Sequence, residues 1–255
     1  MTKRQSPNME AASFISKHSV ALLLPDQSRP GGVRPVGSGS LVTFDGRHFI
    51  LTATHVWAAL RRSSIIHYSA IAERSHSASL HKDSLTSYSL DDNVRENPKP
   101  FDADLTLLEL HAVDYRNMDA RLSFFPLERE EVGLINDFVT IGSPGVLAQK
   151  DSTETNTLSM ELRAIFVEAL TEEEERDGLD FLKALPFQDR DSPIRDYHGL
   201  SGGGLWSVHY YPEKAADKRY EVFLIGVNFY QDEKEIRCLG PKAIKKLIQK
   251  VREPG

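Results

Sequence analysis

Residues 199–204, Gly-Leu-Ser-Gly-Gly-Gly, place a serine hydroxyl inside a run of glycines. Glycine lets the backbone approach a ligand closely and adopt angles that other residues avoid. Two more motifs precede this one. Residues 51–55 read Leu-Thr-Ala-Thr-His at the end of an apolar segment, and residues 104–108 read Asp-Leu-Thr-Leu-Leu at the start of another. The chain therefore presents a histidine, an aspartate and a serine in that order.

These three residue types together suit nucleophilic catalysis. A serine hydroxyl is a weak nucleophile at neutral pH, so it needs a base to take its proton and a third group to orient that base. His55 is the candidate base, Asp104 the candidate orienting acid and Ser201 the candidate nucleophile. Attack on a carbonyl creates an oxyanion that needs preorganised N–H donors. The main-chain amides of Gly199 and Ser201 are the candidates for this oxyanion hole.

Asp102 competes with Asp104 for the role of the acid. The two residues lie two apart, so on a strand both side chains would point to the same side. We prefer Asp104 because the alternation of Leu105 and Leu107 begins directly after it.

Taken together, the motifs resemble those of the trypsin-like (chymotrypsin-fold) serine peptidases, and the disulfide-free bacterial members more than the secreted digestive ones. The matching segments are Thr-Ala-Thr-His at 52–55, Asp-Leu-Thr-Leu at 104–107, Gly-Leu-Ser-Gly-Gly at 199–203 and, more weakly, residues 137–145. The resemblance implies an all-β fold of two antiparallel β-barrels and a serine endopeptidase that needs no cofactor. It implies one peptidase unit over residues 1–255. Residues 1–130 would form the barrel with the base and the acid, and residues 131–255 the barrel with the nucleophile.

The same resemblance suggests how a substrate would bind. Arg195, six residues before the nucleophile, would lie at the base of the specificity pocket, where a cation favours an acidic side chain before the scissile bond. His198 would be a second contact. A peptide would lie as an extended strand beside Val227, Asn228 and Phe229. Leu200 replaces the aspartate that pairs with a newly cut N-terminus in the digestive enzymes, so activation by that ion pair is not available.

Three other interpretations compete with this one. A Gly-x-Ser-x-Gly motif also opens the nucleophile elbow of α/β-hydrolases, but that fold needs a histidine well after the serine, and only His209 follows Ser201. Asp45 before His55 suggests the subtilisin order, but Asp-Gly between two apolar runs is better explained as a hairpin turn. A catalytically idle relative that binds a peptide or a partner protein in the same groove stays open.

Composition limits the partners and the compartment. The chain has 255 residues, a net charge of −6 and 40% hydrophobic residues, which suits a packed core and offers no field to attract nucleic acid. Its one cysteine, Cys238, cannot form an intramolecular disulfide, and the N-terminal residues are polar, so we expect a cytoplasmic protein without membrane contact. His76 and His81 lack cysteines or carboxylates at ligand spacing, so we expect no metal site.

The pattern of residues also predicts local elements. The clearest is a hairpin of residues 40–44 and 48–53 around the Asp45-Gly46 turn, followed by one helical turn at 56–60. We expect a short N-terminal helix ending near residue 17, a C-terminal helix over 241–251 and a helix beginning at Thr171, where four glutamates follow. Further strands are expected at residues 20–24, 138–141, 158–167, 222–229 and 235–239.

Residues 74–100 have little periodicity and are expected to form long exposed loops. A free peptidase inside a cell is hazardous, and this chain lacks the N-terminal activation device. We therefore expect a regulatory protein, a ligand or a rearrangement of this segment to control activity, with a protein or peptide as substrate.

Overall fold

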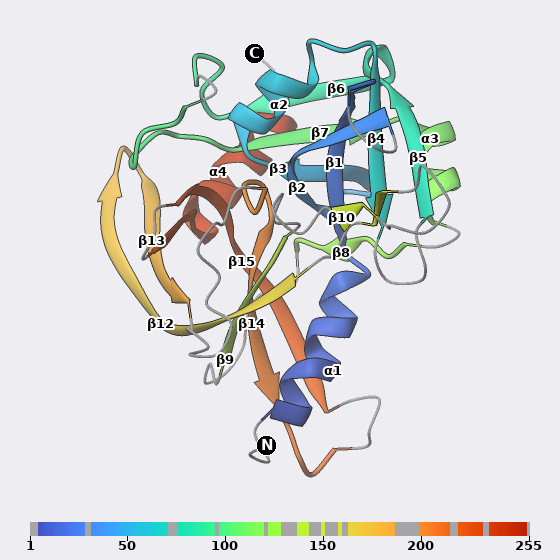
Figure 1. Ribbon diagram of the computed structural model, residues 1–255. Coiled ribbons are helices and arrows are strands. Elements are labelled where there is room, and N and C mark those ends of the chain that lie inside the picture. Colours follow the sequence, from blue (N-terminus) through green and yellow to red (C-terminus); the bar gives the residue numbers. More distant parts are fainter. Residues whose placement is uncertain are drawn as a thin grey trace.

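The computed structural model describes most of the chain, and the account below concerns those residues alone: 5–28, 32–70, 76–94, 97–119, 122–128, 137–142, 149–150, 158–159, 163–186, 199–214, 219–231 and 235–253. The fold class predicted from the sequence is confirmed. The protein is an all-β, double-barrel-like molecule with a helix near each end of the chain (Figure 1).

The N-terminal half forms one curled sheet in the order β5-β4-β1-β2-β3-β7-β6, with the short β8 added in parallel beside β2. Its edge strands β5 and β6 are not paired with each other, so this half is an open, barrel-like sheet. The strands are β1 (Ser19–Pro25), β2 (Val33–Phe44), β3 (Arg47–Thr52), β4 (Ile65–Ala70), β5 (His76–His81), β6 (Leu85–Ser89), β7 (Thr106–Leu110) and β8 (Phe125–Pro126).

The predicted hairpin lies at the centre of this sheet, formed by β2 and β3. Asp45 and Gly46 adopt φ angles of 48° and 69°, as a two-residue turn with left-handed backbone requires. Leu41 pairs with Ile50, and both side chains are fully buried. Because the turn fixes the register of the hairpin, it also fixes the position in the sheet at which β3 ends at Thr52.

The C-terminal half is a closed barrel in the order β12-β13-β16-β15-β14-β9. Its strands are β9 (Asp137–Gly142), β12 (Arg163–Arg176), β13 (Leu179–Pro186), β14 (Gly204–Tyr210), β15 (Tyr220–Gln231) and β16 (Ile236–Leu239). A separate two-stranded sheet pairs β10 (Gln149–Lys150) with β11 (Leu158–Ser159).

Four α-helices and one 3₁₀ helix, η2 (Lys82–Ser84), accompany the strands of the described residues. The α-helices are α1 (Gln5–Ser16), α2 (Thr54–Leu60), α3 (Ala112–Asp119) and α4 (Pro241–Arg252). None of these helices has both the length and the hydropathy needed to cross a bilayer.

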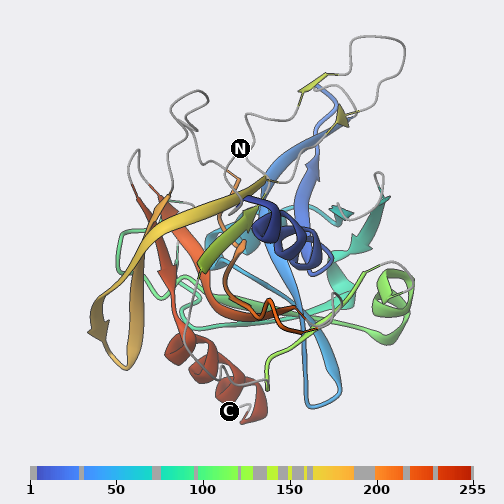
Figure 2. The same cartoon turned by 90° about the horizontal axis from the view of Figure 1, so that it is seen from below.

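The two terminal helices join the two halves of the chain, since α1 packs on the barrel and α4 packs on strands of both halves. From the N-terminus, α1 buries Ala11 and Ile15 against a cluster that includes Trp206 of the barrel. From the C-terminus, α4 buries Leu247 and Val251 in a cluster that contains residues of the first sheet together with Phe181 and Phe229 of the barrel. Figure 2 shows α1 beside the barrel strands and α4 on another side of the molecule.

Polar contacts fix α4 at both of its ends. The buried Asp180 of β13 accepts hydrogen bonds from the main-chain N–H groups of Lys242 (3.1 Å) and Ala243 (3.0 Å). At the other end, Lys250 Nζ donates to Ser89 O at 2.6 Å, and Arg252 forms two hydrogen bonds with Asp45 in the hairpin turn.

Two predictions of local structure are wrong. The glutamates after Thr171 belong to β12 and not to a helix, because Asp177 and Gly178 adopt φ angles of 53° and 73° and turn the chain back into β13. Within residues 74–100, β5 and β6 form where exposed loops were expected. They are the two edge strands of the sheet, and the pairing with β4 and β7 supplies the order that their composition does not predict.

Candidate active site

His55 is placed by the junction between β3 and α2. The strand ends at Thr52, Ala53 occupies the N-cap position of the helix, and His55 follows in the first helical turn. The ring is mostly buried, with 13% of the side chain exposed. The histidine therefore lies in a helix that directly follows the predicted hairpin, at the far end of β3.

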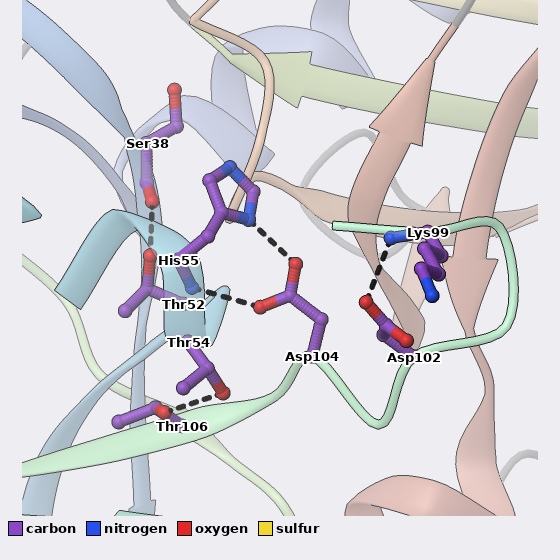
Figure 3. A network of polar contacts seen from close by, with 8 residues as sticks. All are labelled: Ser38, Thr52, Thr54, His55, Lys99, Asp102, Asp104 and Thr106. Atoms are coloured by element: carbon purple, nitrogen blue, oxygen red, sulfur yellow. Dashed lines mark hydrogen bonds and ion pairs between the residues drawn. The ribbon is translucent and has the colours of Figure 1, made fainter. Parts of the chain in front are cut away.

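Asp104 holds His55 through two hydrogen bonds (Figure 3). One carboxylate oxygen accepts the His55 main-chain N–H at 2.9 Å, and the other lies 2.5 Å from Nδ1 of the ring. Asp104 is fully buried. Because a carboxylate only accepts hydrogen bonds, Nδ1 carries the proton and Nε2 is left as the basic nitrogen.

Asp102 does not contact His55. Its side chain turns away and accepts the main-chain N–H of Lys99 at 2.7 Å, as Figure 3 shows. The segment between Asp102 and Asp104 bends before β7 begins, so the two side chains do not share one side of a strand as the spacing suggested. Of the two candidate acids, the structure pairs Asp104 with the histidine.

Ser201 lies in a tight loop of the barrel that is packed against the first sheet. Gly199 and Gly202 have φ angles of 95° and 85°, in the region that favours glycine. The main-chain N–H of Ser38 on β2 donates to Ser201 O at 2.8 Å. A Cβ built on Gly202 would lie 2.1 Å from Ser38 O and 3.1 Å from Ala53 N. The loop therefore touches the segment that carries His55.

Ser201 and His55 are not joined directly. Neighbouring contacts bring their segments together, since a Cβ built on Gly37 would lie 2.6 Å from Val56 Cγ2 and 2.8 Å from Ser201 O. The hydrogen bonds among the described residues do not include one between Ser201 Oγ and the His55 ring. Catalytic hydrogen bonds are often long before substrate binds and shorten in the complex.

The candidate oxyanion donors are the main-chain N–H groups of Gly199 and Ser201. Gly202 N donates to Asn228 O at 2.7 Å and Gly203 N to Leu200 O at 2.8 Å, whereas the N–H groups of Gly199 and Ser201 have no acceptor within the part of the chain described. Two amides in one loop without an acceptor among the described residues suit an anion site.

The predicted substrate-binding residues have mixed outcomes. Val227, Asn228 and Phe229 lie on β15 with fully buried side chains. The main chain of Asn228 already bonds to Gly202 and Gly203, so an added peptide strand would have to pair beyond it. Arg195 and His198 lie outside the described residues.

A cavity of 680 Å³ lies beside α2 and is not lined by His55 or Asp104. Its lining includes Ala58 of α2, Arg61 directly after the helix, and Asn97 and Lys99 from the segment that precedes Asp104. Ala58 follows His55 by nearly one helical turn.

Ser38 contacts the loop of Ser201 and was not among the residues predicted from the sequence. It lies in a run of small residues, Gly-Ser-Gly-Ser at 37–40, within an otherwise apolar strand. Small residues inside a strand often mark the place where another backbone approaches, and this signal could have found it. Among the described residues, no group of three or more His, Cys, Asp or Glu side chains is arranged to hold a metal ion.

Comparison with known proteins assigns no family. No family model and no curated protein matches the chain. One similar solved structure bears the name "Aromatic interactions drive the coupled folding and binding of the intrinsically disordered Sesbania mosaic virus VPg protein". It is 15% identical, with a TM-score of 0.49, and the match covers 88% of this chain and 85% of that one. This degree of similarity assigns no function.

Proposed function

We propose that the protein is a trypsin-like serine endopeptidase that cleaves peptide bonds in protein substrates, with His55, Asp104 and Ser201 as its catalytic residues. The observation that carries the proposal is the buried Asp104 carboxylate, which holds the His55 ring and its main chain together. A buried carboxylate that fixes the tautomer of a partly exposed imidazole, beside a serine on a glycine loop, suits acyl transfer.

In this mechanism Ser201 Oγ attacks the carbonyl carbon of the substrate while His55 Nε2 takes its proton. The amides of Gly199 and Ser201 bind the oxyanion, and Asp104 stabilises the imidazolium. His55 then gives the proton to the leaving amine, which breaks the peptide bond and leaves an acyl group on Ser201. A water molecule, activated by the same histidine, releases the acid.

The preferred residue before the scissile bond and the cellular compartment are further parts of the proposal. A cationic Arg195 at the pocket would favour an acidic residue before the scissile bond. The buried thiol of Cys238 suits a reducing, intracellular compartment, and burial raises the pKa of that thiol, so it is not a competing nucleophile.

Covalent labelling tests the proposal. A fluorophosphonate should label the folded protein at Ser201, and Ser201→Ala should abolish labelling and lower kcat toward peptides by about 10⁶-fold. Ser28→Ala, which removes an exposed serine, is the matched control and should leave labelling unchanged. A peptide library then reports whether acidic residues precede the cleaved bond.

A second candidate is a catalytically idle module that binds a peptide or a partner protein through the same groove. The missing hydrogen bond between Ser201 and His55 favours it. Failure of the folded protein to label, combined with saturable binding of library peptides, would support this module and refute the peptidase.

A further inference from the structure

Ser38 contacts the loop of the candidate nucleophile through both its side chain and its main chain. Ser38 Oγ donates a hydrogen bond to Gly199 O at 2.7 Å, and its N–H donates to Ser201 O at 2.8 Å. The residue is 1% exposed. It comes from β2 of the first sheet, whereas the loop belongs to the barrel.

The two accepting carbonyls, Gly199 O and Ser201 O, lie on either side of the Ser201 N–H along the backbone. That N–H is one of the two proposed oxyanion donors. Glycine at 199, with a φ of 95°, has wide conformational freedom. A rotation of the backbone there would turn the neighbouring N–H groups away from a shared point. The hydrogen bonds from Ser38 fix the carbonyls on both sides of the Ser201 N–H and so oppose that rotation.

The same residue also connects the loop to the strand that leads to the histidine. Thr52, the last residue of β3, donates its Oγ1 proton to Ser38 O at 2.7 Å (Figure 3). Thr52 is fully buried. Glycine is required on both sides of Ser38. A Cβ on Gly37 would lie 2.8 Å from Ser201 O, and a Cβ on Gly39 would lie 2.6 Å from Ile50 Cγ2.

We propose that Ser38 is a positioning residue that holds the amides of Gly199 and Ser201 in the geometry of an oxyanion hole. Its role depends on the proposed peptidase function, because only a reaction that develops an oxyanion needs this geometry. Ser38 does not touch the reacting atoms. It acts through the loop, from the half of the chain that carries the base.

The test compares Ser38→Ala with Ser40→Ala. Ser40 lies two residues further along β2, is fully buried, and its Oγ has no hydrogen-bond partner among the described residues. Both variants remove one buried hydroxyl from the same strand, but only Ser38→Ala removes the bond to Gly199 O. Circular dichroism and thermal melting show whether each variant folds. If Ser38→Ala does not fold, Ser38→Cys, a weaker donor of similar size, replaces it.

Two measurements then decide the proposal. In steady-state kinetics on a cleaved peptide, Ser38→Ala should lower kcat about 10- to 100-fold with KM nearly unchanged, because displaced donors weaken transition-state binding and not substrate binding. Ser40→Ala should match the wild type. In hydrogen exchange, the peptide that contains residues 199–203 should exchange faster in Ser38→Ala only.

The outcomes separate this proposal from the proposed function. If the wild type cleaves peptides and Ser38→Ala has the same kcat as Ser40→Ala, Ser38 has no positioning role. If the wild type neither labels nor cleaves, the peptidase function fails. The exchange measurement still applies in that case, and equal loop exchange in the two variants overturns the role of Ser38 independently.

Discussion

Replacing Asp104 by asparagine tests which carboxylate orients the histidine. Asp104 is fully buried and accepts from both the main chain and Nδ1 of His55. An asparagine keeps the shape but has one acceptor oxygen and one NH₂ group. If its oxygen continues to accept the main-chain N–H, its NH₂ faces Nδ1 and donates to it. The ring then carries its proton on Nε2, where the base should be free.

The expected loss is large because the histidine has the wrong tautomer. Asp104→Asn should lower kcat by about 10⁴-fold, which corresponds to about 5.4 kcal/mol of transition-state stabilisation. Asp102→Asn is the matched control two residues away, since the Asp102 side chain accepts the main-chain N–H of Lys99 and does not contact His55. It should change kcat less than about threefold, because an asparagine oxygen can accept the same bond.

The assay is steady-state hydrolysis of a peptide found in the library, together with the rate of fluorophosphonate labelling. Melting temperatures confirm that both variants fold. An unchanged rate in Asp104→Asn, or an equal loss in Asp102→Asn, would refute the assignment of the acid.

Three further predictions concern stability. Asp180→Ala should lower the free energy of unfolding in urea by about 1–2 kcal/mol, because it removes the acceptor for two amides at the start of α4. Burial lowers the pKa of His18 below its ordinary 6.5, so the unfolded chain takes up a proton first as the pH falls. Stability is therefore full above pH 6.5 and decreases below it, and His18→Asn, which can still donate to Ser123 O, should weaken this decrease in thermal melts. Gly202→Ala should destabilise the protein and abolish labelling, because its Cβ would lie 2.1 Å from Ser38 O.

Each of these has a clear contrary result. Unchanged urea unfolding in Asp180→Ala would show that the cap contributes little. A wild type whose melting temperature is constant between pH 7 and pH 5, or a parallel decrease in His18→Asn, would exclude His18 as the source of acid sensitivity. A Gly202→Ala variant that melts and labels like the wild type would mean that the loop can move away from β2.

The sequence predicted those parts of the fold in which local signals and tertiary contacts agree. The Asp45-Gly46 turn between alternating apolar residues predicted the central hairpin, and the hairpin places His55. The C-terminal helix followed from the spacing of Ile244, Leu247 and Val251, and the structure buries that face. In each case the spacing of the hydrophobic residues is typical of one kind of element, a strand in the hairpin and a helix at the C-terminus.

The strands that were not predicted are those in which charged or polar residues leave no clear apolar alternation. The glutamates of β12 suggested the start of a helix, but the two-residue turn at Asp177 and the inward side chains of Leu179 and Phe181 determine a hairpin. The strands β5 and β6 are edge strands with few apolar residues, so alternation is weak in both.

The candidate site shows the same limit. The order of the three motifs identified the pair of His55 and Asp104, but spacing alone left Asp102 as a rival until the hydrogen bonds separated them. The run of small residues around Ser38 marks a close backbone approach, but its partners, Gly199 and Ser201, are far away in the sequence, so the sequence does not show which backbone approaches. A buried serine has no periodic signature.

The packing of the terminal helices affects how the protein would respond to a broken backbone. A cut between residues 128 and 137 would produce two fragments, of which the first carries α1, packed on the barrel, and the second carries α4, packed on strands of both halves. Separating them would expose Ala11 and Ile15 of one fragment and Leu247 and Val251 of the other to water. The nicked protein should therefore remain a single noncovalent particle, and fragments produced separately should complement each other only when both retain their helices.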